Sequence, residues 1–313
     1  MTQKSGFVIV AIANKVLRGG FMSQPKELLR SVFLVFSTLT IGSVAFAACK
    51  PNSNVVEATP TPLPLKIEKS DKLIDIGTHK LHVVLSDLPG EYTIVLEAGG
   101  GKYADSYQEI QDSLATLTGI RVMSYDRSGF GQSELGPEHF NAIDEVDALK
   151  KLLEIQGYKD HFILAGLSYG GYLVQLFAHR YPELVSGIVL IDPFNVCFVD
   201  RFGLDKLNAA TPHFENPTTN SEKAGNRMVD YLPETYGALR GKKLPPQMPV
   251  ILLTSGNPPF SSSIWRQCHE EMMTSSEKHQ LIIAEGNNHD IVEENPDLVL
   301  KTIIEFVKRI KSK

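Results

Sequence analysis

The stretch HFILAGLSYGGY, residues 161–172, decides the fold of this chain. Its apolar or small residues 162–165 form a short run that suits a strand buried on both faces. The pentapeptide Gly166-Leu167-Ser168-Tyr169-Gly170 follows directly, and residues 172–179 carry apolar side chains at helical spacing. Strand, G-x-S-x-G and helix in this order are typical of a nucleophile elbow, a sharp turn that projects a serine hydroxyl above the sheet. The sequence therefore predicts that Ser168 is a nucleophile.

The glycines around Ser168 have a steric purpose in this interpretation. Gly166 and Gly170 lack a Cβ atom, so the strand and the helix can approach each other closely. The alternative is a glycine-rich turn between a strand and a helix, in which the serine has no chemical role. The elbow is favoured because the flanking strand and helix patterns stand where the motif needs them.

Short apolar runs alternate with helical patterns through the rest of residues 67–313. The last helical pattern begins with Asn295 as N-cap and Pro296 in the first turn. Strands that alternate with helices predict an α/β fold, namely a doubly wound, mostly parallel sheet of eight strands with its ligand site at their carboxyl ends. Besides the elbow strand, the predicted strands are residues 73–76, 81–85, 92–96, 121–125, 187–191, 249–254 and 280–284.

Residues 195–246 interrupt this alternation after the sixth strand. The segment is longer than an ordinary loop and carries weak helical patterns at residues 204–210 and 224–239. A structureless loop of this length is unusual inside a compact domain. We therefore expect a small helical cap over the site.

Charge and cysteine content limit the classes of function. The chain has 313 residues and a formal net charge of −5. Its first 49 residues hold five Lys/Arg and one acidic residue, so the remainder carries about −9. An acidic domain is a poor binder of nucleic acid or anionic lipid. Three cysteines do not make a disulfide scaffold, and the sequence alone does not decide whether Cys197 and Cys268 pair.

Residues 1–49 have the pattern of an export segment. Lys26 and Arg30 precede the uncharged run 31–48, which ends in Ala-Phe-Ala-Ala before Cys49. A basic region, an apolar region and small residues at a cleavage site are typical of a signal peptide. The end of this segment resembles the lipobox of bacterial lipoproteins, which implies that Cys49 is lipidated and anchors an exported protein to the membrane.

Two other interpretations of the export segment stay open. Ordinary signal peptidase would release the protein, and an uncleaved segment would remain as a membrane anchor. Met22 is an alternative start of the chain. Residues 50–66 are rich in proline and threonine and predict an extended tether ahead of the domain at 67–313.

Five motifs, in this order, resemble the α/β-hydrolase superfamily, specifically its serine esterase and proline-iminopeptidase-like branch. The resemblance covers about residues 67–311 and is weakest in the cap. It implies an α/β-hydrolase fold and hydrolysis of a small acyl substrate. The motifs are LEAGGG (96–101), YDRSGFGQS (125–133), GLSYGG (166–171), VLIDP (189–193) and GNNHDIVEENPDLV (286–299).

The resemblance implies a catalytic triad. Ser168 matches the nucleophile, and His289, just beyond the last strand, matches the base that activates it. The usual position of the acid, after strand 249–254, holds no carboxylate. Asp192 ends the preceding strand, where some superfamily members have their acid, and we expect it to orient His289. Asp290 and Glu270 are alternatives, and Asp192 as a simple turn residue is another.

The resemblance also implies an oxyanion hole. The N–H of Tyr169 supplies one donor, and the turn after strand 92–96 supplies the other, from Gly100 or alternatively Gly101. The cluster at residues 268–271, Cys-His-Glu-Glu, has metal-binding residue types, but adjacent residues of a helix point in different directions. We expect neither a metal nor another cofactor.

The sequence thus favours a hydrolase of carboxylic esters or related acyl compounds that works through an acyl-enzyme on Ser168. Cleavage of amides, as in prolyl aminopeptidases, is the first alternative. A non-catalytic binding protein on the same scaffold is the second. The substrate and the oligomeric state are not predicted, and contact with a membrane is expected only through the N-terminal segment.

Overall fold

The computed structural model describes residues 66–259, 263–273 and 276–312. The predicted export segment with Cys49, and the predicted tether up to residue 65, lie outside the described residues. Within the described part, no helix is both long and apolar enough to cross a membrane.

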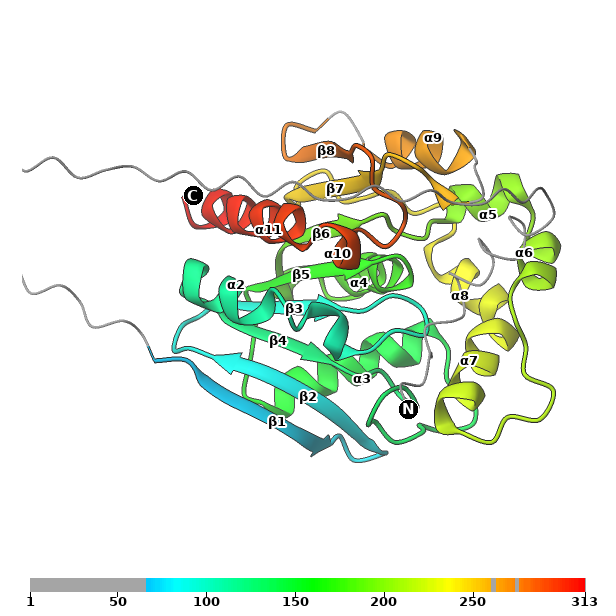
Figure 1. Ribbon diagram of the computed structural model, residues 1–313, viewed down its shortest axis with the longest axis horizontal. Helices are drawn as coiled ribbons and strands as arrows, with labels where there is room; N and C mark the ends of the chain where they lie inside the picture. The colour runs from blue at the N-terminus through cyan, green and yellow to red at the C-terminus, as the bar shows by residue number, and fades with distance from the viewer. Residues whose placement is uncertain (1–65, 260–262, 274–275, 313) are drawn as a thin grey trace, which may run out of the picture. The chain divides into compact units, whose positions relative to one another are not determined.

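The core is an eight-stranded sheet with the order β1-β2-β4-β3-β5-β6-β7-β8 (Figure 1). β1 is antiparallel to β2 and β2 to β4, and the remaining pairs are parallel. This confirms the predicted doubly wound, mostly parallel sheet. The strands are β1 (Glu68–Asp75), β2 (Lys80–Asp87), β3 (Thr93–Glu97), β4 (Arg121–Tyr125), β5 (Phe162–Leu167), β6 (Val185–Ile191), β7 (Val250–Ser255) and β8 (His279–Ala284).

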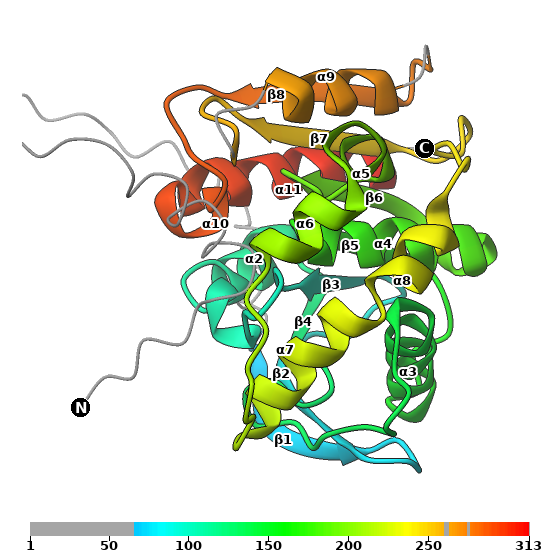
Figure 2. The ribbon, with the colours of Figure 1, turned by 90° about the vertical axis from the view of Figure 1, so that its right-hand side faces the viewer.

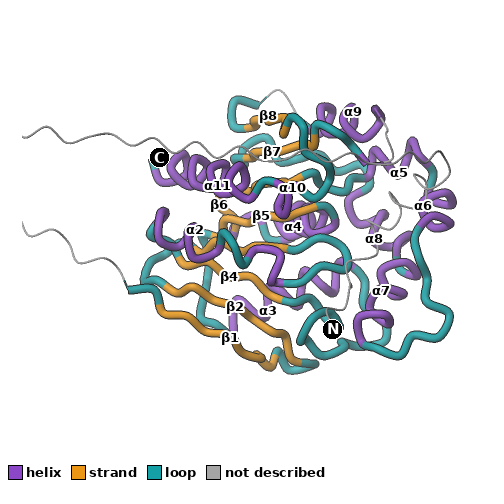
Figure 3. Tube along the Cα trace, viewed as in Figure 1, coloured by secondary structure: helices purple, strands orange, loops and turns teal. Residues whose placement is uncertain are grey.

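Helices cover both faces of the sheet, and Figure 3 shows the strands as a layer between them. The long helices are α2 (Gln111–Thr118), α3 (Ala142–Ile155), α4 (Tyr169–Arg180), α9 (Ser263–Met272) and α11 (Pro296–Lys311). The shorter ones are η1 (Ala104–Tyr107), η2 (Pro182–Leu184) and α10 (Ile291–Glu294).

Alternation along the central strands explains why both faces need a cover. In β3, Val95 packs in one buried cluster with side chains of α3 and α4, whereas Ile94 and Leu96 pack in a second with those of α2 and α11. Successive side chains of a strand point to opposite faces, so a strand between two helical layers is apolar throughout. All five residues of β3 are buried.

Helices α3 and α11, which flank the sheet, begin at side-chain caps. The side chain of Asn141 accepts hydrogen bonds from the backbone at the start of α3, and Asp144 completes a capping box. Asn295 caps α11 by accepting from the N–H of Leu298, and Pro296 stands in the first turn as predicted. These caps fix where each helix starts relative to the strand before it.

The segment between β6 and β7 is helical, as the sequence predicts. It contains α5 (Val196–Phe202), α6 (Leu204–Ala210), α7 (Asn220–Asp230) and α8 (Leu232–Leu239). Figure 2 shows these helices in front of the carboxyl ends of the central strands. We call this segment, residues 195–246, the cap.

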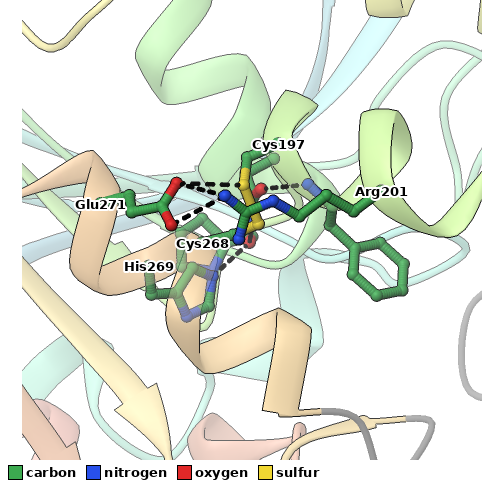
Figure 4. The surroundings of a disulfide bond; sticks show 8 residues. Cys197, Arg201, Cys268, His269 and Glu271 are labelled. Carbon is green, nitrogen blue, oxygen red and sulfur yellow. Dashed lines mark hydrogen bonds and ion pairs between the residues drawn. A yellow bond between two sulfur atoms is a disulfide. The ribbon is translucent and has the colours of Figure 1, made fainter.

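A disulfide joins the cap to the main body of the domain. It links Cys197 of α5 to Cys268 of α9, which are separated by 71 positions in the chain (Figure 4). The sequence left this pairing open. The same helix pair is also joined at the surface by an ion pair between Arg201 and Glu271.

Candidate active site

The predicted elbow is present between β5 and α4. Ser168 has φ 55° and ψ −118°, a conformation rarely adopted by residues with a side chain. A Cβ atom on Gly170 would lie 2.4 Å from the carbonyl oxygen of Glu97 and 2.5 Å from that of Ala98. A Cβ on Gly166 would lie 2.5 Å from the carbonyl carbon of Gly170. The two glycines therefore let β5, α4 and the end of β3 meet closely.

The chain brings Ser168, His289 and Asp192 together in one hydrogen-bonded row. His289 Nε2 lies 2.8 Å from Ser168 Oγ, and His289 Nδ1 lies 2.6 Å from Asp192 Oδ2. An ionised carboxylate can only accept, so Nδ1 carries the proton and Nε2 is free to accept from the Ser168 hydroxyl. This is the arrangement in which a histidine can act as a base toward a serine.

Asp192 is fully buried at the end of β6. Burial disfavours its ionised form. The hydrogen bonds from His289 Nδ1 and from the N–H of Ser255 outweigh burial and lower the pKa of this carboxyl below its ordinary value. Asp192 thus stays ionised beside His289 at neutral pH.

Ser255 occupies the end of β7, where the superfamily more often has the acid. Its N–H donates to Asp192 Oδ1 at 2.8 Å, and its hydroxyl donates to Oδ2 at 3.0 Å. The two other acids that the sequence suggested lie elsewhere. Asp290 forms an ion pair with Lys102 at 3.4 Å, and Glu270 is exposed on α9.

The turn after β3 lies beside the elbow. Gly100 and Gly101 are buried in this turn, and Gly101 has φ 69°. Arg127 fixes the start of the turn, because its guanidinium donates to the carbonyls of Ala98 at 2.5 Å and Gly99 at 2.7 Å. The carbonyls of Glu97 and Ala98, at the start of this turn, lie against Gly170 of the elbow.

Arg127 belongs to a buried charge network that the sequence did not reveal. Its guanidinium lies 3.0 Å from Glu97 and 3.4 Å from Glu145, and all three side chains are buried. Burial raises the pKa of Glu97, and burial raises the pKa of Glu145 to about 7, against the opposing effect of Arg127. Two carboxyl groups therefore share one cation.

Asp126 supports the neighbouring loop. Its carboxylate accepts from the N–H groups of Ala104 and Gln132, each at 2.8 Å, and from His82 Nδ1 at 2.8 Å. These contacts join the end of β4 to η1 and β2. Asp126 is thus a structural residue of the loop that carries Arg127.

No metal site is found in the described part of the chain. The cluster at residues 268–271 is committed to other contacts. Cys268 is in the disulfide, and His269 is hydrogen-bonded to Thr254 and to the carbonyl of Pro193.

Known proteins resemble parts of this chain. A family model described as the alpha/beta hydrolase fold matches residues 92–244. A probable transporter, efuK, of Hormonema carpetanum is 32% identical over 127 residues, 38% of this chain and 18% of that protein. A proline iminopeptidase of Lactobacillus helveticus is 28% identical over 126 residues, 38% of this chain and 42% of the enzyme. The chain therefore matches less than half the length of either relative.

A solved structure supports the fold over a longer range. The structure of E-2-(acetamidomethylene)succinate hydrolase superposes with a TM-score of 0.60 at 19% identity, covering 77% of this chain and all of that one. At 19% identity, this similarity supports a shared fold alone. The α/β hydrolase fold predicted from the sequence is confirmed.

Proposed function

We propose that this protein, which has the α/β hydrolase fold, is a serine hydrolase that cleaves a carboxylic ester or a related acyl compound. The observation that supports this function best is the row Ser168 Oγ, His289, Asp192, with distances of 2.8 and 2.6 Å. Ser168 also stands in the strained elbow conformation that exposes such a nucleophile.

In the first half of the proposed reaction, the Ser168 oxygen attacks the carbonyl carbon of the substrate. His289 Nε2 takes the hydroxyl proton, and Asp192 stabilises the imidazolium through Nδ1–H. The leaving alcohol departs with the proton from His289, and the acyl group remains on Ser168. In the second half, His289 takes a proton from water, and the hydroxide attacks the acyl-enzyme. The bond to Ser168 Oγ then breaks, His289 returns the proton to this oxygen, and the acid is released.

The negative charge of each tetrahedral intermediate needs hydrogen-bond donors. We assign these to the backbone N–H of Tyr169 and of Gly100, with Gly101 as the alternative to Gly100. One such donor contributes roughly 3–4 kcal/mol to the stabilisation of a transition state. The contacts of Arg127 with the carbonyls of Ala98 and Gly99 hold this turn in place.

A fluorophosphonate probe and short p-nitrophenyl esters test this function. We expect the wild-type protein to be labelled and to release p-nitrophenol, and Ser168→Ala to lose both activities. Ser113→Ala, which removes a serine hydroxyl on α2, serves as the control and keeps both. Absence of label and turnover in folded wild-type protein would instead support a non-catalytic binding protein.

A prolyl aminopeptidase-like activity is the second candidate, because of the similarity to the proline iminopeptidase of Lactobacillus helveticus. It would use the same acyl-enzyme chemistry on an amide. Proline p-nitroanilide and a p-nitrophenyl ester, compared on one preparation, distinguish the two. A kcat/KM for the anilide above that for the ester would favour the peptidase.

We also propose that the domain works outside the cytoplasm, attached to a membrane by a lipid on Cys49. The signal-like pattern of residues 26–49 and a disulfide typical of exported proteins support this location. Mass spectrometry of the N-terminus of the expressed protein tests it. An unmodified Cys49 within an intact N-terminal segment would contradict the proposal.

A further inference from the structure

Helix α9 packs behind the acid of the candidate triad. The ring of Trp265 meets that of His289 edge to face, with centroids 5.4 Å apart and planes at 87°. Arg266 donates to the carbonyls of Ser255 and Gly256, each at 2.9 Å. One turn further along the helix, His269 contacts Thr254 of β7 and the carbonyl of Pro193, the residue after Asp192. Helix α9 thus contacts His289, the end of β7 beside Asp192, and the turn that follows Asp192.

The hydrogen bonds of His269 fix its tautomer. His269 is fully buried, with Nε2 2.8 Å from the carbonyl oxygen of Pro193 and Nδ1 2.9 Å from Thr254 Oγ1. A carbonyl only accepts, so Nε2 carries the proton. Burial lowers the pKa of His269, which keeps the ring neutral. Nδ1 then accepts, and the Thr254 hydroxyl donates to it.

The bond to Pro193 acts on the backbone of Asp192. Pro193 follows Asp192 directly, and its carbonyl is held while the Asp192 backbone sits at φ 41°. The single proton of the Thr254 hydroxyl is donated to His269, so Asp192 Oδ1, which lies 3.3 Å from Thr254 Oγ1, accepts from the N–H of Ser255. The second carboxylate oxygen, Oδ2, accepts from His289 Nδ1 and from the Ser255 hydroxyl.

We infer that His269, held in place by the Thr254 hydroxyl, is a positioning residue for the triad: through the Pro193 carbonyl it fixes the backbone of Asp192, and so the orientation of its carboxylate and of His289. The inference rests on the proposed serine hydrolase function. His269 is buried behind Asp192 and reaches neither Ser168 nor the space above it. Its loss should therefore lower kcat and leave KM nearly unchanged.

A pair of substitutions at Thr254 tests this inference without removing the histidine. Thr254→Val keeps the shape and removes the hydroxyl, and Thr254→Ser keeps the hydroxyl and removes a methyl group. With a short p-nitrophenyl ester we expect Thr254→Val to lower kcat about tenfold, because it leaves a buried acceptor unpaired. We expect Thr254→Ser to keep most of kcat and both variants to keep KM within about twofold.

Two substitutions at His269 give an independent comparison. The amide N–H of His269→Gln can still donate to the Pro193 carbonyl, whereas His269→Leu has no donor. We expect kcat to fall less for His269→Gln than for His269→Leu, and Gln267→Ala, an exposed change on α9, to match the wild type. Thermal melting of each variant identifies any that do not fold, and the Thr254 pair then decides.

Each outcome separates this inference from the proposed function. Active wild-type protein whose kcat is unchanged by Thr254→Val, or falls equally with Thr254→Ser, would overturn the role of His269 and leave the serine hydrolase intact. A rise in KM with constant kcat would also overturn it. Wild-type protein that neither turns over ester nor reacts with fluorophosphonate would remove the hydrolase function itself.

Discussion

Ser168 and Asp192 share a positive φ, at 55° and 41°. Among the described residues other than glycine, only His161 also has one. A residue with a side chain in such a conformation costs about 1–3 kcal/mol and persists only where its surroundings fix it. Here the surroundings include the bond from the N–H of Ser168 to the Ile191 carbonyl, at 2.9 Å, and that from the N–H of Asp192 to the Leu253 carbonyl, at 2.7 Å. The two strained residues therefore follow neighbouring strands, and both contact His289.

Asp192→Asn tests the assignment of the acid. An asparagine would present its amide to His289 and no longer stabilise the imidazolium, so we expect kcat to fall by about 10³–10⁴. Measurement of kcat and KM on a p-nitrophenyl ester checks this. Asp290→Asn and Glu270→Gln are matched controls with small expected effects. Full activity in Asp192→Asn, or a comparable loss in either control, would show that the acid is elsewhere.

Gly170→Ala tests the close approach at the elbow. The new Cβ would lie 2.4 Å from the Glu97 carbonyl oxygen, so α4 or the turn after β3 must move. We expect at least a tenfold loss of kcat and a lower melting temperature, because the donors that we propose for the oxyanion hole move with that turn. Gly237→Ala in α8 is the control: its Cβ meets nothing within 4 Å, and it should raise stability by about 0.5–1 kcal/mol. Equal effects of the two substitutions would contradict the steric argument.

At the scale of elements, the strands and the residues at their ends could be predicted from the sequence. The contacts between elements far apart in the chain could not. Apolar runs such as 92–96 and 121–125 identified buried strands because burial on two faces leaves a plain local pattern. Asp192 was identified because it ends such a strand at a position where some members of the superfamily that the chain resembles have their acid. The sequence did not identify His269 as a neighbour of Asp192, because 77 positions separate them and no local pattern relates α9 to the end of β6. The contacts of Arg127 with Glu97 and Glu145 could not be predicted for the same reason, because no local pattern relates these residues.

The disulfide between α5 and α9 is another contact between elements far apart in the chain, and it stabilises the folded domain. Closing a loop with 71 residues of separation restricts the unfolded chain. We expect the double substitution Cys197→Ala and Cys268→Ala to lower the free energy of unfolding by about 2–5 kcal/mol, measured by urea denaturation. Reductant should destabilise the wild type by a similar amount and leave the double variant unchanged. Equal stability of oxidised wild type and double variant would refute the prediction.

At the scale of the whole molecule, the buried network of Glu97, Arg127 and Glu145 couples global stability to pH. Burial raises the pKa of Glu145 to about 7, from its ordinary value of 4.5. The folded state therefore binds more protons than the unfolded state between these pH values. Stability from this group is lost as pH rises from about 4.5 to 7, and it does not change below or above this range.

Glu145→Gln removes that titration. The free energy of unfolding of the variant, relative to the wild type, should increase between pH 5 and pH 8 by up to about 3 kcal/mol. Urea denaturation of both proteins at the two pH values measures this difference. A difference that is constant with pH would mean that Glu145 is ionised with an ordinary pKa in the folded protein. Glu154→Gln, an exposed change on α3, is the control and should show little dependence on pH.

The fold itself leaves the reaction open, because one scaffold can carry different chemistry or none. The most direct measurement is intact mass spectrometry of the protein mixed with a short p-nitrophenyl ester and stopped within one turnover. Our account predicts a gain of one acyl group, mapped by proteolysis to the peptide that contains Ser168, and no gain in Ser168→Ala. Turnover without a covalent intermediate, or an acyl group on another residue, would contradict it.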